Sequence, residues 1–225
     1  MRSILFGILN DLLSVIGLKV TRPMVSLSDF KLLFTSHSVD NTRTDMLELV
    51  AYEINLKKIN GHTAELGVYR GDFAKHINYL FPDRKLYLFD TFEGFDKRDI
   101  SNELENNLSS GSQDFSDTNI DIALSKMTHP SNCIVKKGFF PETVRDLDSN
   151  ILYAFVSIDT DLYSPILSGL EYFYPRLSTG GYIFVHDFNN SEYSGARKAV
   201  LDFCKNYNVP YVPISDGWGT VVIAK

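Results

Sequence analysis

Short apolar runs alternate with amphipathic helical patterns along most of this chain. We interpret the apolar runs as β-strands at residues 63–68, 86–90, 133–137, 153–159 and 182–187. Between them, apolar residues recur at helical spacing near residues 72–81, 117–127, 163–175 and 194–206. Strands that alternate with helices pair in parallel, because each helix returns the chain to the start of the next strand. The pattern therefore predicts an α/β fold with a Rossmann-like, doubly wound sheet.

The last two apolar runs break this alternation. Residues 211–214 and 220–224 are separated by the sequence SDGWG, which is too short to hold a helix. We therefore expect these runs to form an antiparallel hairpin at the sheet edge. A dehydrogenase-type Rossmann domain keeps its strands parallel, so this ending argues against a nicotinamide cofactor.

The residues before the first strand predict a helical extension. Residues 43–58 form an amphipathic pattern that ends at Asn60-Gly61, a typical helix stop. Residues 1–19 also carry apolar side chains at helical spacing, from Leu5 to Ile16. Polar residues interrupt this run, so it lacks the roughly 20 continuous apolar residues of a membrane span, and it shows no A-x-A-type cleavage site. We divide the chain into an extension (1–60), which makes acceptor or oligomer contacts, and a catalytic domain (61–225).

Two uses of the segment 1–19 are compatible with its sequence. The amphipathic helix can pack on the domain or on a second subunit, which would make the protein a homo-oligomer. It can instead lie on a membrane surface. Only two cations, Arg2 and Lys19, lie in the segment, and this favours packing on protein.

The charge balance argues against a nucleic-acid partner. The chain has 225 residues, with 22 basic and 28 acidic side chains and a formal net charge of -6. Nucleic-acid-binding proteins usually carry a clustered basic face instead. The two cysteines, Cys133 and Cys204, lack metal-site or redox-motif spacing, so we interpret them as core residues of a protein in a reducing, cytoplasmic compartment.

The first strand ends in a glycine-containing turn that could cradle a cofactor. Gly67 lets the chain turn tightly and Gly71 lets the next helix approach the strand, although a purely structural turn has the same signature. Asp90 ends the following strand, where a carboxylate can accept hydrogen bonds from both ribose hydroxyls or can cap a helix. Glu65 adds a negative charge that suits an amino or sulfonium group and would repel a pyrophosphate.

Acidic residues also end the fourth and fifth predicted strands. Asp159 and Asp161 follow one strand, and His186-Asp187 follows the other. Because the carboxyl ends of parallel strands lie along one edge of the sheet, we expect these side chains to converge there. Carboxylates that converge need a counter-charge, and a divalent cation, with magnesium favoured, is the simplest one. The alternative is that these residues cap the helices that follow.

A long polar stretch separates the second and third predicted strands. Residues 93–116 are acidic and rich in serine and asparagine. The stretch exceeds the usual length of a strand–helix connection. It is either a lid or substrate loop or a solvated surface insertion.

The sequence resembles the macrocin O-methyltransferase family, whose members are metal-dependent enzymes that methylate sugar hydroxyls of macrolide and aminocoumarin antibiotics. The matching segments read AELGVYRGDFA, LFDTFEGF, KKGFFPETV, VSIDTDLYSPILSGLEYFYPRLSTGGYIFVHDF and SGARKAV, and they extend from about residue 63 to residue 200. The resemblance implies a class I methyltransferase fold that uses S-adenosylmethionine. It covers most of the predicted catalytic domain and none of residues 1–40.

The resemblance also implies roles for individual residues. Asp159 and Asp187 would bind the metal, and Asp161 would act as general base. The cofactor site would include Glu65, Gly67, Tyr69, Asp90 and Thr91, to which we add Val68, Gly71 and Phe92 from the same two loops.

One position departs from the family pattern. The family usually has two adjacent aspartates where this chain has His186-Asp187. An imidazole ligand at residue 186 would favour zinc, manganese or iron over magnesium, and the ring could also point away from the metal.

We therefore expect an S-adenosylmethionine-dependent O-methyltransferase that is assisted by a divalent metal. The acceptor would be a hydroxyl of a sugar in a glycoside, natural product or surface glycan. Two alternatives stay open: a metal-free small-molecule methyltransferase and an inactive S-adenosylmethionine-binding protein. Retention of Asp159, Asp161 and Asp187 argues against loss of activity, and the absence of a G-x-G-x-x-G motif argues against a nicotinamide-dependent oxidoreductase.

Overall fold

The computed structural model describes residues 41–225. The predicted helix over residues 1–19, with its oligomer or membrane contact, lies outside these described residues and stays a prediction. Helix α2 (Asn41–Leu56), which we expected in the extension, belongs to the same compact unit as the sheet. None of the described helices is long and apolar enough to cross a membrane.

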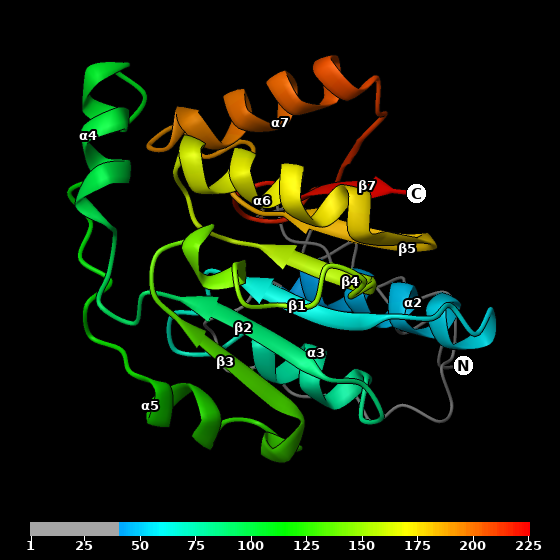
Figure 1. Ribbon diagram of the computed structural model, residues 1–225. Helices are drawn as coiled ribbons and strands as arrows, with labels where there is room; N and C mark the ends of the chain where they lie inside the picture. The colour runs from blue at the N-terminus through cyan, green and yellow to red at the C-terminus, as the bar shows by residue number, and fades with distance from the viewer. Residues whose placement is uncertain (1–40) are drawn as a thin grey trace, which may run out of the picture. The chain divides into compact units, whose positions relative to one another are not determined.

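A mixed, seven-stranded sheet forms the centre of this unit (Figure 1). Its strands in chain order are β1 (His62–Leu66), β2 (Leu86–Asp90), β3 (Cys133–Lys137), β4 (Tyr153–Ile158), β5 (Leu177–Val185), β6 (Val212–Pro213) and β7 (Val221–Ala224). The spatial order is β3-β2-β1-β4-β5-β7-β6, and β1 to β5 run parallel. Strand β7 pairs antiparallel with both β5 and β6. The predicted fold class and the C-terminal hairpin are therefore confirmed.

Helices cover both faces of the sheet (Figure 1). Helices α2 and α3 (Ala74–Leu80) lie on one face, and α6 (Tyr163–Arg176) and α7 (Ser194–Tyr207) lie on the other. Helix α6 turns Ile166, Leu170 and Phe173 towards the sheet at helical spacing, and all three are fully buried. All six residues of β4 are buried because this strand is covered on both faces.

The connection between β2 and β3 holds two helices, α4 (Lys97–Glu105) and α5 (Ile120–Ser125). Short 3-10 turns, η1 (Pro130–Asn132) and η2 (Glu142–Val144), flank β3. Helix α4 corrects the interpretation of residues 93–116 as a loop. Its sequence KRDISNELE lacks an apolar stripe, and the residues that it buries are Asp99 and Glu103. Apolar periodicity therefore could not reveal this helix.

Strand β5 also begins five residues before the predicted start, at Leu177 rather than Tyr182. Gly180 and Gly181 obscured the strand pattern, because glycine usually weakens a strand. Gly181 is needed there, since a Cβ at this position would lie 2.8 Å from the carbonyl oxygen of Ala154 on β4.

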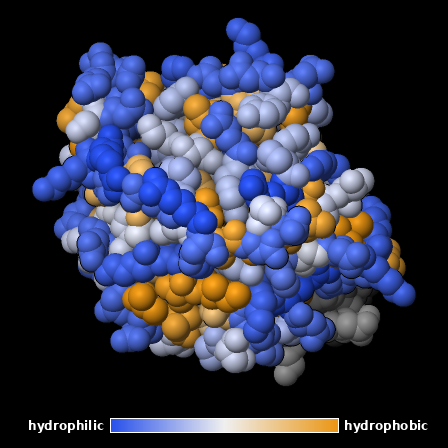
Figure 2. Space-filling view, viewed as in Figure 1, coloured by the Kyte–Doolittle hydropathy of each residue, from blue (hydrophilic) through white to orange (hydrophobic). Residues whose placement is uncertain are grey.

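In Figure 2, hydrophobic residues gather over β3, whereas mostly hydrophilic residues cover α4.

Candidate active site

A cleft of about 650 Å³ lies at the carboxyl edge of the parallel strands. The sheet register creates it: Leu66 of β1 pairs with Phe89 and Ile158, and Ile158 pairs with Val185. These four strands consequently end side by side. Each of these four paired residues is followed in the chain by a residue that lines the cleft: Gly67, Asp90, Asp159 and His186.

At the cofactor end of the cleft, Gly67 permits a close approach between two strand ends. Its φ is +85°, and a Cβ there would lie 2.0 Å from the carbonyl oxygen of Asp159. No other residue fits this position without moving the backbone. The glycine therefore brings the predicted cofactor turn and the predicted metal-site loop together.

Asp90 organises the two loops that we expected to bind the cofactor. One carboxylate oxygen, Oδ2, accepts hydrogen bonds from the backbone N–H groups of Val68 (2.6 Å) and Tyr69 (2.7 Å). The other oxygen, Oδ1, accepts one from the backbone N–H of Phe92 (2.6 Å). The carboxylate is thus fixed between both loops, and its contact with a ribose stays a prediction.

Six of the residues expected at the cofactor site line the cleft: Glu65, Gly67, Val68, Tyr69, Asp90 and Thr91. Gly71 and Phe92 do not belong to its lining. A Cβ at Gly71 would lie 3.1 Å from Cα of Ala123, so this glycine permits close packing against α5 rather than helix–strand approach. Phe92 is buried, and its backbone rather than its ring connects it with the site.

Glu65 is a buried acidic residue of the described cleft. Its side chain is buried, and neither carboxylate oxygen has a hydrogen-bond partner among the described residues. Burial raises the pKa of Glu65 well above its usual value, although the nearby Arg43 opposes the rise. A buried, unpartnered carboxylate is costly, so a cationic ligand group that reached Glu65 would relieve that cost.

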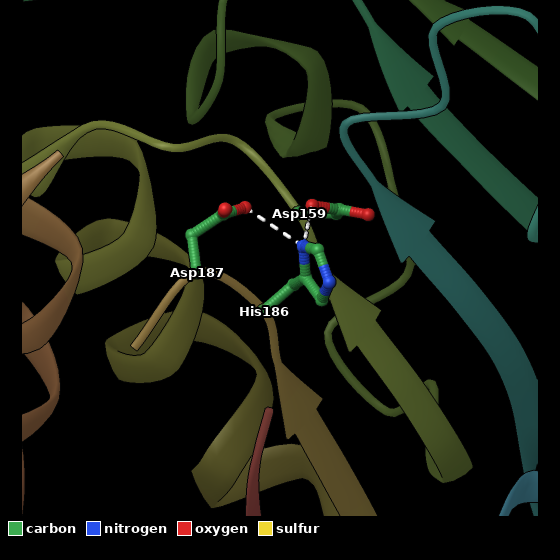
Figure 3. A group of neighbouring side chains, drawn as sticks. All are labelled: Asp159, His186 and Asp187. Carbon is green, nitrogen blue, oxygen red and sulfur yellow. Dashed lines mark hydrogen bonds and ion pairs between the residues drawn. The ribbon is translucent and has the colours of Figure 1, made fainter. Parts of the chain in front are cut away.

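The structure brings the three predicted metal ligands together (Figure 3). Donor atoms of Asp159, His186 and Asp187 all lie within 4.8 Å of one another. Nδ1 of His186 is 3.1 Å from Oδ1 of Asp159 and 2.8 Å from Oδ2 of Asp187. His186 therefore points into the acidic group and not away from it. Asp161, the predicted base, lines the same cleft.

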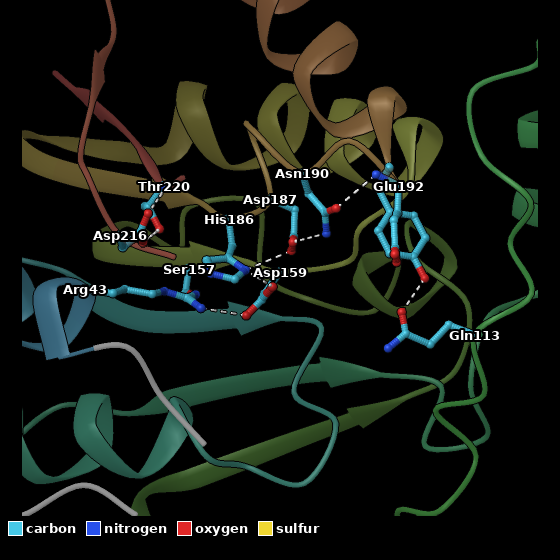
Figure 4. A network of polar contacts seen from close by, with 11 residues as sticks. Arg43, Gln113, Ser157, Asp159, His186, Asp187, Asn190, Glu192, Asp216 and Thr220 are labelled. Atoms are coloured by element: carbon cyan, nitrogen blue, oxygen red, sulfur yellow. Dashed lines mark hydrogen bonds and ion pairs between the residues drawn. The ribbon is translucent and has the colours of Figure 1, made fainter. Parts of the chain in front are cut away.

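Arg43 is a buried residue of the cleft that our sequence interpretation missed (Figure 4). Its guanidinium donates from Nη1 to Oδ2 of Asp159 (2.7 Å) and from Nη2 to Oγ of Ser157 (3.0 Å), and it stacks at 3.8 Å over the Phe73 ring. The side chain is buried. Because Arg43 holds Oδ2 of Asp159, the other oxygen, Oδ1, is the one that faces His186.

These contacts shift the ionisation of the site. Burial opposes the charge of Asp159, but His186 and Arg43 outweigh it and hold the pKa of Asp159 well below its usual value. Burial, reinforced by Asp187 and Asp159, raises the pKa of Asp161 well above its usual value. Burial would lower the pKa of His186, but Asp159 outweighs it and raises this pKa to about 10. Asp161 therefore has a stronger tendency to take up a proton than an ordinary aspartate.

Non-glycine residues with left-handed backbones cluster around the cleft. Tyr69 (φ 49°) and Asp161 (φ 60°) line it, as does Asp187 (φ 61°), and Phe92 (φ 52°) adjoins it. Such conformations cost free energy and persist where the surroundings impose them, often at functional sites. Asn190 helps to impose one of them by donating from Nδ2 to Oδ1 of Asp187 (2.9 Å).

The sheet topology and the strand-edge cleft define a class I methyltransferase fold. The family model of macrocin-O-methyltransferase (TylF) matches residues 32–220. The chain therefore belongs to the macrocin O-methyltransferase family, which confirms the sequence resemblance, and it is an O-methyltransferase.

Solved structures show the same fold. The O-methyltransferase NovP matches with a TM-score of 0.65 and 19% identity, over 82% of this chain and 79% of that chain. The calicheamicin methyltransferase CalS11 matches with a TM-score of 0.65 and 19% identity, over 81% of this chain and 78% of that chain. An apo structure of CalS11, described as a TDP-rhamnose 3'-O-methyltransferase, matches with a TM-score of 0.56 and 20% identity, over 90% of this chain and 88% of that chain. No curated protein sequence matches the chain.

Proposed function

We propose that this enzyme transfers the methyl group of S-adenosylmethionine to a sugar hydroxyl. The observation that carries the proposal is Glu65, a buried carboxylate in the cleft with no hydrogen-bond partner among the described residues. S-Adenosylmethionine carries an amino group and a sulfonium, and either can supply the missing positive charge. A pyrophosphate cofactor would instead be repelled.

Aromatic side chains support a sugar as the acceptor. Phe95, Phe115 and Tyr193 line the cleft, and the centroid of the Phe95 ring lies 5.1 Å from that of Phe115 and 6.1 Å from that of Tyr193. Such rings can pack against the apolar face of a sugar while its hydroxyls reach polar neighbours. The structurally similar CalS11 is described as a TDP-rhamnose 3'-O-methyltransferase, which supports a sugar acceptor.

Asp161 would act as the general base. The acceptor oxygen attacks the methyl carbon, the carbon–sulfur bond breaks, and S-adenosylhomocysteine leaves. The hydroxyl proton passes to the carboxylate of Asp161, whose raised pKa makes it a stronger base than an exposed aspartate. The left-handed backbone at Asp161 fixes the direction from which this carboxylate enters the cleft.

The residues present fit a divalent metal. Two carboxylates and an imidazole whose donor atoms all lie within 4.8 Å of one another would suit a divalent ion. We therefore propose these three residues, Asp159, His186 and Asp187, as the metal ligands, with His186 losing its proton when the ion binds. Magnesium is the expected ion, although the imidazole also suits manganese, zinc or iron. A divalent ion would add positive charge that stabilises the acceptor oxygen as its proton leaves.

One observation favours a second candidate, a metal-free methyltransferase. Arg43 and His186 already place two cationic groups against Asp159. In that case the charges of the chain itself would balance the acidic group, and Asp161 would still take the proton.

Calorimetric titration and a methyl-transfer screen test the proposal. S-Adenosylhomocysteine should bind the full chain, NAD should not, and Glu65→Gln should weaken binding of S-adenosylhomocysteine while a substitution of the exposed Glu105→Gln should not. Nucleotide sugars, glycolipids and free glycosides would then be screened for a mass gain of one methyl group. Loss of activity after exhaustive chelation supports the metal, whereas full activity supports the metal-free alternative. Binding of NAD in preference to S-adenosylhomocysteine would contradict the proposal.

We also propose a cytoplasmic location, because both Cys133 and Cys204 are free thiols, as expected in a reducing compartment.

A further inference from the structure

Helix α4 has an unusual distribution of polar and apolar residues. Its buried residues are Asp99, with 8% of its surface exposed, and Glu103, with none, whereas Leu104 is 56% exposed. Asp99 and Glu103 are four residues apart and therefore share one side of the helix. Figure 1 places α4 beyond the carboxyl ends of the parallel strands, and Asp99 of this helix lines the cleft. The helix thus turns an acidic face inwards.

The two buried acids differ in their partners. Oε1 of Glu103 accepts a hydrogen bond from the backbone N–H of Tyr163 (2.7 Å), and Oε2 accepts one from the Ser109 hydroxyl (2.7 Å). Glu103 therefore anchors α4 to the first turn of α6. The side chain of Asp99 has no hydrogen bond or ion pair among the described residues, yet it lines the cleft.

The neighbours of Asp99 do not neutralise it. The adjacent Arg98 is exposed, binds Asp96 through Nε (2.8 Å) and Nη2 (2.9 Å), and stacks over the Phe139 ring. Asp96 and Glu103 are themselves acidic. Burial, reinforced by Asp96 and Glu103, raises the pKa of Asp99 to about 7. No described side chain donates to this carboxyl group, so its donors come from water or from a ligand in the cleft.

The charge of the cleft limits what that donor can be. Nine acidic residues line the described cleft, against two basic residues, Arg43 and His186, both of which contact Asp159. A phosphate-bearing acceptor would be repelled by this surplus of negative charge. A hydroxyl pair or an amino group of a phosphate-free sugar would be attracted.

We propose that Asp99 is a specificity-determining residue, which accepts hydrogen bonds from hydroxyl or amino groups of a phosphate-free sugar acceptor. This inference rests on the proposed function and extends it to the acceptor class. The carboxylate selects the acceptor and takes no part in the removal of its proton.

The test compares Asp99→Asn with a control on the same helix, Glu105→Gln, whose side chain is exposed. The full-length chain is supplied with S-adenosylmethionine and three probes: methyl α-L-rhamnopyranoside, methyl 2-amino-2-deoxyglucopyranoside and TDP-rhamnose. Wild type should methylate a phosphate-free probe with a higher kcat/KM than TDP-rhamnose. The KM for that probe should rise roughly tenfold or more in Asp99→Asn, with little change in kcat, because a charge-assisted hydrogen bond is lost.

Thermal unfolding separates recognition from structural support. Asp99→Asn removes an unpartnered buried carboxylate, so its unfolding midpoint should equal or exceed that of wild type. A lower midpoint would show that Asp99 supports the fold and would overturn the proposal.

The proposal is also overturned by an unchanged KM, by a preference for TDP-rhamnose, or by the absence of activity on both phosphate-free probes at tens of millimolar. In each case, calorimetry with S-adenosylhomocysteine identifies what failed. Intact cofactor binding in wild type restricts the failure to Asp99, whereas lost cofactor binding contradicts the proposed function itself.

Discussion

Replacement of Arg43 by methionine removes the guanidinium that joins α2 to the acidic site and keeps an unbranched side chain. The variant loses a buried ion pair to Asp159 and a hydrogen bond to Ser157. Breaking a buried pair by removal of one partner costs about 3–5 kcal/mol. His186 still faces Asp159 in the variant, so we expect the lower end, about 3 kcal/mol.

This loss is large enough to measure by thermal unfolding. For a domain of this size, each kcal/mol shifts the midpoint by about 2–4 °C, so Arg43→Met should unfold about 6–12 °C below wild type. Arg197→Met is the matched control. Arg197 also stacks on a phenylalanine ring, Phe188 at 4.4 Å, and makes a side-chain hydrogen bond, but it is exposed. Its variant should shift by less than about 2 °C.

Divalent ions extend the test to the proposed metal site. A bound cation supplies counter-charge to Asp159, so magnesium or manganese should raise the midpoint of Arg43→Met by more than that of wild type. The reasoning is refuted if Arg43→Met and the Arg197→Met control have the same midpoint of thermal unfolding. It is also refuted if Arg43→Met loses stability but divalent ions raise its midpoint no more than that of wild type.

Three further substitutions test separate parts of the site and the fold. Asp90→Ala removes the acceptor of three loop N–H groups, so the affinity for S-adenosylhomocysteine should fall about tenfold or more by calorimetry. Asp161→Asn should keep that affinity but slow the single-turnover methyl-transfer rate by roughly 10²–10⁴-fold, with no rescue by added metal. Burial lowers the pKa of His76 to about 4, below its unfolded value near 6.5. The unfolded state therefore binds an extra proton between pH 6.5 and 4, and stability should fall by up to about 1.4 kcal/mol per pH unit as the pH drops through this window. His76→Leu should lose this dependence in urea unfolding.

Each of these predictions has a contradicting result. Asp121→Ala, at an exposed acid in the first turn of α5 outside the cleft lining, is the control for Asp90 and should leave cofactor affinity unchanged. Equal affinities of the Asp90 and Asp121 variants would remove the organising role of Asp90. A wild-type rate in Asp161→Asn would exclude it as the base. Parallel pH profiles of wild type and His76→Leu would mean that His76 is not a buried neutral histidine.

The parallel sheet and the position of the cleft were predictable because each rests on local signals. The β4 sequence YAFVSI is continuously buried, and such a run between helical patterns is typical of a central parallel strand. Gly67 and Asp159 each follow a strand, so a parallel sheet alone places both at one edge. Their contact required no knowledge of distant side chains.

Arg43 was not predicted because its partner, Asp159, is 116 residues away. A signal for it nevertheless exists in α2. Arg43 precedes Leu47, Val50 and Ile54 at helical spacing, so it lies on the apolar stripe of the helix, and all four residues are buried. A charged residue within such a stripe needs a buried partner, and the partner must be acidic. The identity of that acid depends on tertiary packing, which the stripe cannot specify.

The acidic face of α4 also places charged residues on the buried side of a helix, but only one of its two acids pairs within the fold. Asp99 and Glu103 occupy the positions of a helical stripe where apolar residues would be expected, so the helix was invisible to a search for hydrophobic periodicity. Glu103 finds its donors within the fold, whereas Asp99 does not. Only the tertiary structure distinguishes Glu103, which supports α4, from Asp99, which we propose as a contact of the acceptor.

The free energy stored at the cleft has a consequence for ligand binding. Glu65 is buried without a hydrogen-bond partner among the described residues, and Asp161 and Asp187 have left-handed backbones. These features lower the stability of the ligand-free chain, because an unsatisfied buried group costs about 1–3 kcal/mol. A cofactor that satisfies Glu65 recovers part of this cost only in the folded state. Its binding should therefore stabilise the fold strongly, and the Glu65→Gln variant should start from a higher unfolding midpoint and gain less from S-adenosylhomocysteine than wild type.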